Sequence, residues 1–272
     1  MEDNKTAFSE ALDALRHDDP SGTLDYHSWV LSRSHALCVT VPKVACSRVK
    51  TTLHQLDGGE QPEHAGWIHD QGQCLASFTT SEMVEILTSP RWFRFCIVRN
   101  PYERLLSAYK TQIANTWNDE YLWLKEAIKS KFGYPRARGE DRPEFLVAFR
   151  DLVRFLRDGD RDAAYDGHFN VQSRILRLDL IEYDFVGRFE NFQADFATAL
   201  RHISAPDDVI KTVEEVMNWT YRIHPAIAYD KELADAVFEI YEDDFTNFDY
   251  DRDSWMHESS FHESRMTTPK EQ

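Results

Sequence analysis

Residues 36–56, ALCVTVPKVACSRVKTTLHQL, constrain the fold of this chain more than any other stretch. Residues 36–41 are apolar and rich in β-branched side chains, which is typical of a buried strand. Val49 and Leu53 follow at helical spacing and predict a helix. A helix that begins just after a strand presents unpaired amides and a positive dipole at its first turn. The loop at residues 42–47 is therefore expected to bind an anion, most often phosphate.

The cations of this stretch support the same interpretation. Lys43 opens the loop, Ser47 ends it, and Arg48 and Lys50 follow without an acid anywhere in residues 36–56. A purely structural strand and helix would not explain these cations. The P-loop of nucleotide hydrolases, G-x-x-x-x-G-K-S/T, contains glycines and an adjacent lysine and hydroxyl. This loop has no glycine and its lysine comes first, so a P-loop kinase or NTPase is a disfavoured alternative.

A second strand and helix carry another candidate anion site. The sequence FRFCIV at residues 93–98 predicts a core strand, and Asn100 and Pro101 are a favourable N-cap and first helical residue. Arg99 is thus expected where the strand ends and the helix begins. Ser107 lies eight positions further along, so the face of the helix must aim it.

Charge narrows the range of partners. The formal net charge is −16, with 47 Asp and Glu against 31 Lys and Arg, and such a field repels nucleic acids. Between residues 91 and 110, however, Glu103 is the one acid beside five cations: Arg91, Arg94, Arg99, Arg104 and Lys110. We expect these cations to form a basic pocket that suits a small anionic ligand.

Length and composition indicate a single domain. A chain of 272 residues with 42% hydrophobic residues can build one sizeable core. No apolar run approaches the roughly 20 residues that a membrane-spanning helix needs. The acidic N-terminus is not typical of a signal peptide. The four cysteines lack C-x-x-C spacing, so a cytoplasmic location is expected. The sequence does not indicate an oligomeric state.

Both anion loops resemble those of the sulfotransferases that use phosphoadenosine phosphosulfate (PAPS). The likeness is greatest to the Golgi carbohydrate sulfotransferases of the chondroitin and HNK-1 type and their bacterial relatives. Residues 42–47 match their phosphosulfate loop, P-K-V-x-C-S/T, and residues 99–109 match every fixed position of R-x-P-x-x-R-x-x-S-x-Y. Three weaker resemblances lie at residues 166–176 (DGHFNVQSRIL), 183–196 (YDFVGRFENFQADF) and 240–251 (IYEDDFTNFDYD).

The resemblance implies transfer of a sulfuryl group from PAPS to a hydroxyl of an acceptor, a carbohydrate or glycoconjugate, without a metal. Arg99 and Ser107 would hold the 3′-phosphate of the donor. Lys43 would also take part in the chemistry. The resemblance places the phosphosulfate against six loop and helix residues: Lys43, Val44, Ala45, Cys46, Ser47 and Arg48. Val49 stands where the Golgi enzymes usually have tryptophan.

Transfer to a hydroxyl also needs a base, and histidine is the common choice near neutral pH. His69 lies in the irregular segment between the two anion sites, where the resembling enzymes place a catalytic histidine. His168 is the second candidate and is expected to bind the acceptor. His64 and His69 have no cysteine pair at ligand spacing, so a zinc site is disfavoured. A non-catalytic protein that binds PAPS or sulfated glycans is a further alternative.

The order of these elements predicts the fold. Strands alternating with helices form right-handed crossovers and a parallel sheet with helices on both faces. We expect an α/β three-layer sandwich with a nucleotide-kinase-like core. Residues 1–20 predict a peripheral helix, and Ser81 is expected to cap another helix. Residues 118–157 predict a helical cap over the acceptor side, and residues 252–272 an acidic, flexible tail.

Overall fold

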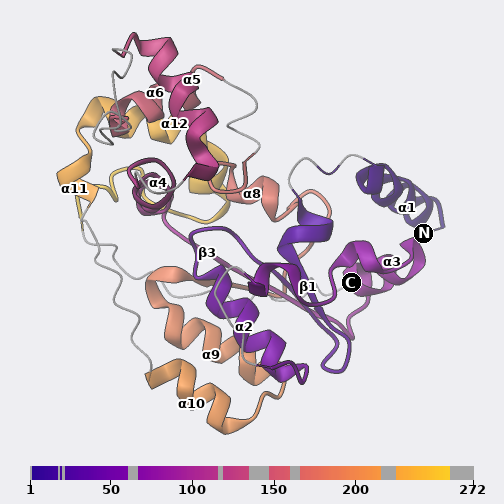
Figure 1. Ribbon diagram of the computed structural model, residues 1–272. Helices are drawn as coiled ribbons and strands as arrows, with labels where there is room; N and C mark the ends of the chain where they lie inside the picture. Colours follow the sequence, from indigo (N-terminus) through magenta and orange to yellow (C-terminus); the bar gives the residue numbers. More distant parts are fainter. Residues whose placement is uncertain are drawn as a thin grey trace. The chain divides into compact units, whose positions relative to one another are not determined.

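The computed structural model describes residues 2–17, 19, 22–60, 67–115, 119–134, 147–159, 166–215 and 225–257. They fall into two compact units (Figure 1). The first unit takes its described residues from 2–99 and 172–215, and the second from 100–171 and 225–257. Each unit thus joins segments that are distant in sequence, and the single domain stays a prediction.

The first unit is built on a four-stranded sheet in the order β1-β2-β3-β4. The strands are β1 (Ser28–Leu31), β2 (Ala36–Val39), β3 (Phe93–Val98) and β4 (Phe185–Arg188). β2 and β4 both run parallel to β3, which confirms an α/β fold with a mostly parallel sheet.

One edge of the sheet departs from the expected parallel arrangement. β1 pairs antiparallel with β2, with Ser28 opposite Val39 and Leu31 opposite Ala36. Residues 32–35, which connect the two strands, form a turn. A turn of this length allows an antiparallel hairpin, whereas a parallel pair needs a crossover of a dozen or more residues. The predicted parallel sheet therefore has an antiparallel edge strand, β1, that the sequence did not indicate.

The helices of the first unit surround this sheet. They are α1 (Glu2–His17), α2 (Cys46–Leu56), α3 (Thr80–Thr88), α8 (Gln172–Ile175), α9 (Phe192–His202) and α10 (Asp207–Glu215). Figure 1 shows α2, α9 and α10 on the same side of the sheet. Contacts from Arg48 of α2 to Phe192 of α9 and Val213 of α10 hold them together. α1 packs against α3 and buries Leu12 and Leu15.

The start of α3 corrects one expected helix cap. Thr79, and not Ser81, is the N-cap residue. The hydroxyl of Thr79 accepts a hydrogen bond from the Glu82 amide, and the Glu82 carboxylate accepts one from the Thr79 amide at 2.8 Å. This reciprocal capping box satisfies two amides at once, so it is favoured over a single cap at Ser81, two residues later.

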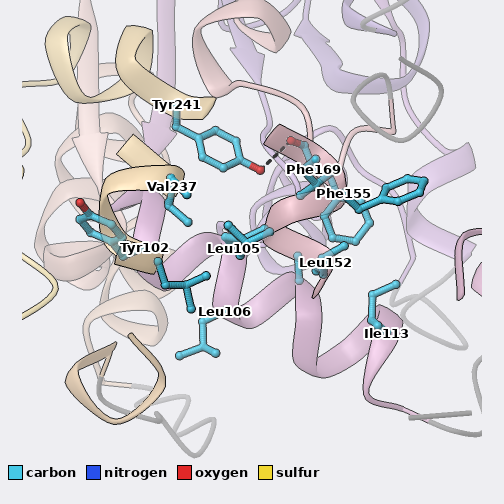
Figure 2. Packing of buried hydrophobic residues seen from close by; sticks show 14 of the residues in the cluster. Tyr102, Leu105, Leu106, Ile113, Leu152, Phe155, Phe169, Val237 and Tyr241 are labelled. Atoms are coloured by element: carbon cyan, nitrogen blue, oxygen red, sulfur yellow. Dashed lines mark hydrogen bonds between the residues drawn. The ribbon is translucent and has the colours of Figure 1, made fainter. Parts of the chain in front are cut away.

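The second unit is helical and has its own core. Its longer helices are α4 (Pro101–Ala108), α5 (Leu122–Phe132), α6 (Phe149–Arg157) and α12 (Lys231–Asn247). A short helix, α11 (Pro225–Ala228), precedes α12. Apolar side chains of α4, α6 and α12 interlock, and the hydroxyl of buried Tyr241 donates to the Phe169 carbonyl at 2.8 Å (Figure 2). This bond ties α12 to the segment that carries His168.

Two predicted regions fall in the second unit. The segment at 118–157 contains α5 and α6, while residues 118 and 135–146 lie outside the described residues, and its role as a cap stays a prediction. In the predicted tail, residues 252–257 are held by the unit: the Tyr102 hydroxyl donates to the Arg252 carbonyl at 2.7 Å. Residues 258–272 lie outside the described residues.

Candidate active site

The loop between β2 and α2 has an unusual backbone. Lys43 and Ala45 both adopt left-handed conformations, with φ of 69° and 54°. Such conformations cost free energy in residues other than glycine and are found most often at functional sites. Ala45 is the N-cap of α2 and has no side-chain oxygen to bond the first-turn amides. The start of α2 thus has no side-chain cap from Ala45, which is consistent with the predicted anion site.

Arg99 connects this loop to the end of β3. Its Nη1 atom donates to the Lys43 carbonyl at 3.1 Å, and its guanidinium lies 4.2 Å from the centre of the Phe189 ring. Arg99 is buried, with 8% of its surface exposed. The two strand ends that the sequence singled out are thus in direct contact, at the carboxyl edge of the parallel strands where such sheets bind ligands.

His69 also belongs to this group. It lies in a short 3-10 helix, Trp67–Asp70, and its Nε2 atom is 3.0 Å from the Ser47 hydroxyl. The His69 ring stacks on Tyr26 with a centroid distance of 5.7 Å and an interplanar angle of 12°. His64, the other histidine of this segment, lies outside the described residues. The first unit therefore brings together Lys43, Ser47, Arg99 and His69.

The structure separates the roles of the basic residues near the loop. The Arg48 guanidinium donates to the Val213 carbonyl at 3.2 Å, and buried Lys50 donates to the Tyr26 carbonyl at 2.7 Å. Both side chains are engaged in packing α2 on its neighbours. The Arg48 guanidinium therefore serves packing, and a role of Arg48 in donor binding stays a prediction.

The expected basic pocket from residues 91–110 is wrong for two of its five cations. Arg94 is the second residue of β3 and binds Asp184 through two nitrogen–oxygen contacts of 3.0 and 3.1 Å. Arg104 is 2% exposed and donates to the carbonyls of Gly167 and Asn170 at 2.7 and 2.8 Å. Both guanidinium groups satisfy groups of the protein, so they serve the fold.

The Arg94 assignment gives the first testable prediction. Arg94→Met leaves the Asp184 carboxylate without its guanidinium and the Leu87 carbonyl without its donor at 2.6 Å. We expect a loss of about 2–4 kcal/mol in the free energy of unfolding, measured in urea. Affinity of the folded fraction for anionic ligands should not change. The control is Arg91→Ala at an exposed position of the same segment, where we expect unchanged stability; equal effects would contradict the assignment.

The remaining two predicted site residues lie in the second unit. Ser107 is partly buried on α4. The prediction that Ser107 and Arg99 bind the 3′-phosphate together is not tested, because Arg99 belongs to the first unit. His168 lies in the second unit too, and its Nδ1 atom is 2.7 Å from the Tyr121 hydroxyl and 3.1 Å from Asp166 Oδ1.

Asp166 and Tyr121 are partners of His168 that sequence reasoning missed. Burial alone would raise the pKa of Asp166, but hydrogen bonds and charge from His168, with the Tyr121 hydroxyl, hold that pKa below its ordinary value. An ionised carboxylate at Nδ1 favours the tautomer with the proton there, which leaves Nε2 as the acceptor. Asp166 begins the resembling segment 166–176, but nothing in the sequence linked Tyr121 to it.

The family of the chain follows from comparison with known proteins. A model of the Sulfotransferase family matches residues 26–251. Carbohydrate sulfotransferase 8 of Mus musculus is 30% identical over 185 residues, which cover 66% of this chain and 44% of the relative. Carbohydrate sulfotransferase 14 of Mus musculus is 30% identical over 188 residues, 69% of this chain and 49% of the relative. The chain therefore belongs to the sulfotransferase family, which confirms the resemblance read from its motifs.

The matches cover only part of the relatives' length. Carbohydrate sulfotransferase 11 of Rattus norvegicus is 24% identical over 248 residues, 83% of this chain and 68% of the relative. The chain spans less than half the length of the first two relatives. No solved structure matches the chain. Among the described helices, none has the length and apolar character needed to cross a bilayer. The family itself implies a sulfate donor and a hydroxylated acceptor.

Proposed function

We propose that this protein transfers a sulfuryl group from PAPS to a hydroxyl of a carbohydrate acceptor. The observation that carries the proposal is the meeting of three predicted elements in the first unit. Arg99 contacts the Lys43 carbonyl, and His69 contacts the Ser47 hydroxyl. A cation, an anion-binding helix start and a candidate base are therefore close to one another. Family membership supports sulfuryl transfer over the P-loop kinase alternative.

The groups at this site fit a phosphosulfate donor. Lys43, the first-turn amides of α2 and the Ser47 hydroxyl all donate hydrogen bonds to anionic oxygens. The loop and helix at residues 36–56 contain no carboxylate that would repel them. PAPS would supply the sulfuryl group and leave as adenosine 3′,5′-bisphosphate. Lys43 and the amides would stabilise charge on the transferred group and on the departing oxygen, which we propose needs no metal.

For the base we propose His69. Its Nε2 atom contacts the hydroxyl of Ser47, the last residue of the anion loop, and stacking on Tyr26 holds the ring in one orientation. Neutral imidazole would take the proton of the acceptor hydroxyl. His168, oriented by Asp166, is the second candidate, and we propose that it binds the acceptor. The carbohydrate class of the acceptor is supported by the names of the relatives.

A cytoplasmic location is part of the proposal. All four cysteines are free thiols. Burial raises the pKa of Cys38 and Cys96, so these two remain protonated and pack as small apolar groups. A protein with several free thiols suits a reducing compartment. Fractionation of cells that express the tagged protein tests the location, and recovery outside the cytoplasmic fraction would refute it.

Transfer of label from radioactive PAPS tests the proposed function. The purified protein is incubated with labelled PAPS and three acceptor classes: polysaccharides, lipid-linked sugars and small hydroxylated molecules. We expect labelled product from a saccharide, with and without EDTA. Donor binding without transfer to any acceptor would favour the non-catalytic alternative. Magnesium-dependent hydrolysis of ATP would favour the kinase or NTPase alternative.

Donor binding gives a second prediction. Arg99→Ala removes the guanidinium that we assign to the 3′-phosphate, and a charge-assisted contact is worth about 1.5–3 kcal/mol. The affinity for adenosine 3′,5′-bisphosphate should therefore fall by about ten-fold to a hundred-fold, measured by calorimetry. Exposed Arg91→Ala is the charge-matched control and should bind like the wild type. An Arg99→Ala protein with wild-type affinity would remove Arg99 from the donor site.

A further inference from the structure

A buried glutamine holds the backbone of Arg99. Gln172 is the first residue of α8 and is 0% exposed. Its Oε1 atom accepts a hydrogen bond from the Arg99 amide at 3.0 Å, and its Nε2 atom donates to the Arg99 carbonyl at 2.8 Å. The two residues are 73 positions apart in sequence. One side chain therefore binds both polar backbone groups of a single residue.

The position of Arg99 explains why this pair of bonds matters. β2 pairs with β3 as far as Cys96, and β4 pairs with it as far as Val98. Arg99 is the next residue and is buried, so its amide and carbonyl need partners from outside these ladders. The carboxamide of glutamine has one donor group and one acceptor group, like a peptide unit. Gln172 thus continues the hydrogen-bonding of β3 by one residue.

The side chain of Arg99 depends on this backbone anchor. Its guanidinium reaches the Lys43 carbonyl at 3.1 Å and covers the Phe189 ring. A rotation of the Arg99 backbone would move both contacts, because the side chain starts from the Cα atom that Gln172 fixes. Gln172, Arg99 and Lys43 therefore form a chain of contacts that runs from α8 through the end of β3 into the anion loop.

We propose that Gln172 is a positioning residue for donor binding. It sets the direction of the Arg99 guanidinium, so its effect is expected at the 3′-phosphate that we assign to Arg99. This inference rests on the proposed function, because the anion that Arg99 binds is taken to be the 3′-phosphate of the donor. Gln172 itself makes no contact with the donor in this proposal.

Two substitutions of Gln172 test the proposal by calorimetry with adenosine 3′,5′-bisphosphate and 5′-AMP. Gln172→Met keeps the volume of the side chain and removes both hydrogen bonds. We expect the affinity for the bisphosphate to fall about ten-fold, because one charge-assisted contact is misdirected, while the affinity for 5′-AMP stays at the wild-type value. The preference for the 3′-phosphate is therefore the quantity that changes.

Gln172→Glu supplies a readout that general destabilisation would not produce. An ionised glutamate has no donor for the Arg99 carbonyl and places a carboxylate oxygen against it. A protonated glutamate has one donor and one acceptor, like glutamine. Burial raises the pKa of such a carboxyl, so protonation is favoured as the pH falls. The bisphosphate affinity of Gln172→Glu, relative to the wild type at the same pH, should recover on acidification.

Ile86→Ala is the control for stability. Ile86 is buried on α3, and its truncation creates a cavity in the same unit away from Arg99. This variant should lower Tm and leave both affinities unchanged. A wild type without preference for the bisphosphate over 5′-AMP would refute the proposed function. If the wild type shows that preference and Gln172→Met shows it in full, the role of Gln172 is refuted and the proposed function stands. The same holds if Gln172→Glu shows the full preference at every pH.

Discussion

His69→Ala is expected to lower kcat by about 10² to 10⁴, the usual contribution of a positioned general base. Affinity for adenosine 3′,5′-bisphosphate should remain near the wild-type value, because His69 contacts the loop through the Ser47 side chain and not through its amides. Steady-state rates with labelled PAPS and calorimetry on the same protein give the two quantities. His168→Ala is the matched control, and we expect it to raise KM for the acceptor more than it lowers kcat.

The same assignment fixes the pH dependence. A histidine base must be neutral to accept a proton, so the wild-type kcat/KM should decline on the acid side of its pH profile. This acid limb should be absent from the residual activity of His69→Ala. If His69→Ala keeps near-full activity and His168→Ala loses it, the base is His168 with Asp166, and the roles are reversed.

Lys43→Ala is expected to show the second large effect. We expect kcat to fall by about 10² to 10³ while donor affinity falls by about ten-fold or less, since the lysine charge matters most when negative charge develops on the leaving oxygen. The left-handed backbone and the carbonyl that binds Arg99 remain in the alanine variant, so the loop keeps its form. The effect therefore reports the ammonium group itself.

Rates and binding on Lys43→Ala and Lys43→Arg separate the two possible roles of this lysine. Arginine keeps the positive charge, so Lys43→Arg should retain more kcat than Lys43→Ala. An unchanged kcat with a raised KM in Lys43→Ala would show that Lys43 only binds the donor and does not stabilise the transition state.

The elements with local signals were predicted well. β3 has the predicted bounds, Phe93–Val98, and Asn100 caps α4 by accepting a bond from the Tyr102 amide at 3.0 Å. These features depend on residues within a few positions of one another. Capping and strand patterns describe such short stretches, so they could predict them. The strand before the anion loop was predicted for the same reason, although β2 ends at Val39.

Features that depend on distant partners were not predicted. The sequence shows that Arg94 and Arg104 are cations but not that Asp184 and two backbone carbonyls bind them. The left-handed backbone at Ala45 could not be predicted, because left-handed conformations are usually indicated by glycine. The sequence showed Gln172 only as one residue of the segment 166–176, because its contact with Arg99 spans 73 positions. Such contacts follow from the topology of the sheet, which a pattern of local residues does not specify.

Calorimetry of the wild-type protein with adenosine 3′,5′-bisphosphate, 5′-AMP and ATP tests the central claim most directly. The claim is that the loop at residues 42–47 and Arg99 together hold a donor with a 5′-phosphosulfate and a 3′-phosphate. The account predicts that the bisphosphate binds at least about ten-fold more tightly than either of the others, without a divalent cation, because a charge-assisted contact to the 3′-phosphate is worth that much. Equal affinity for the bisphosphate and 5′-AMP would contradict it.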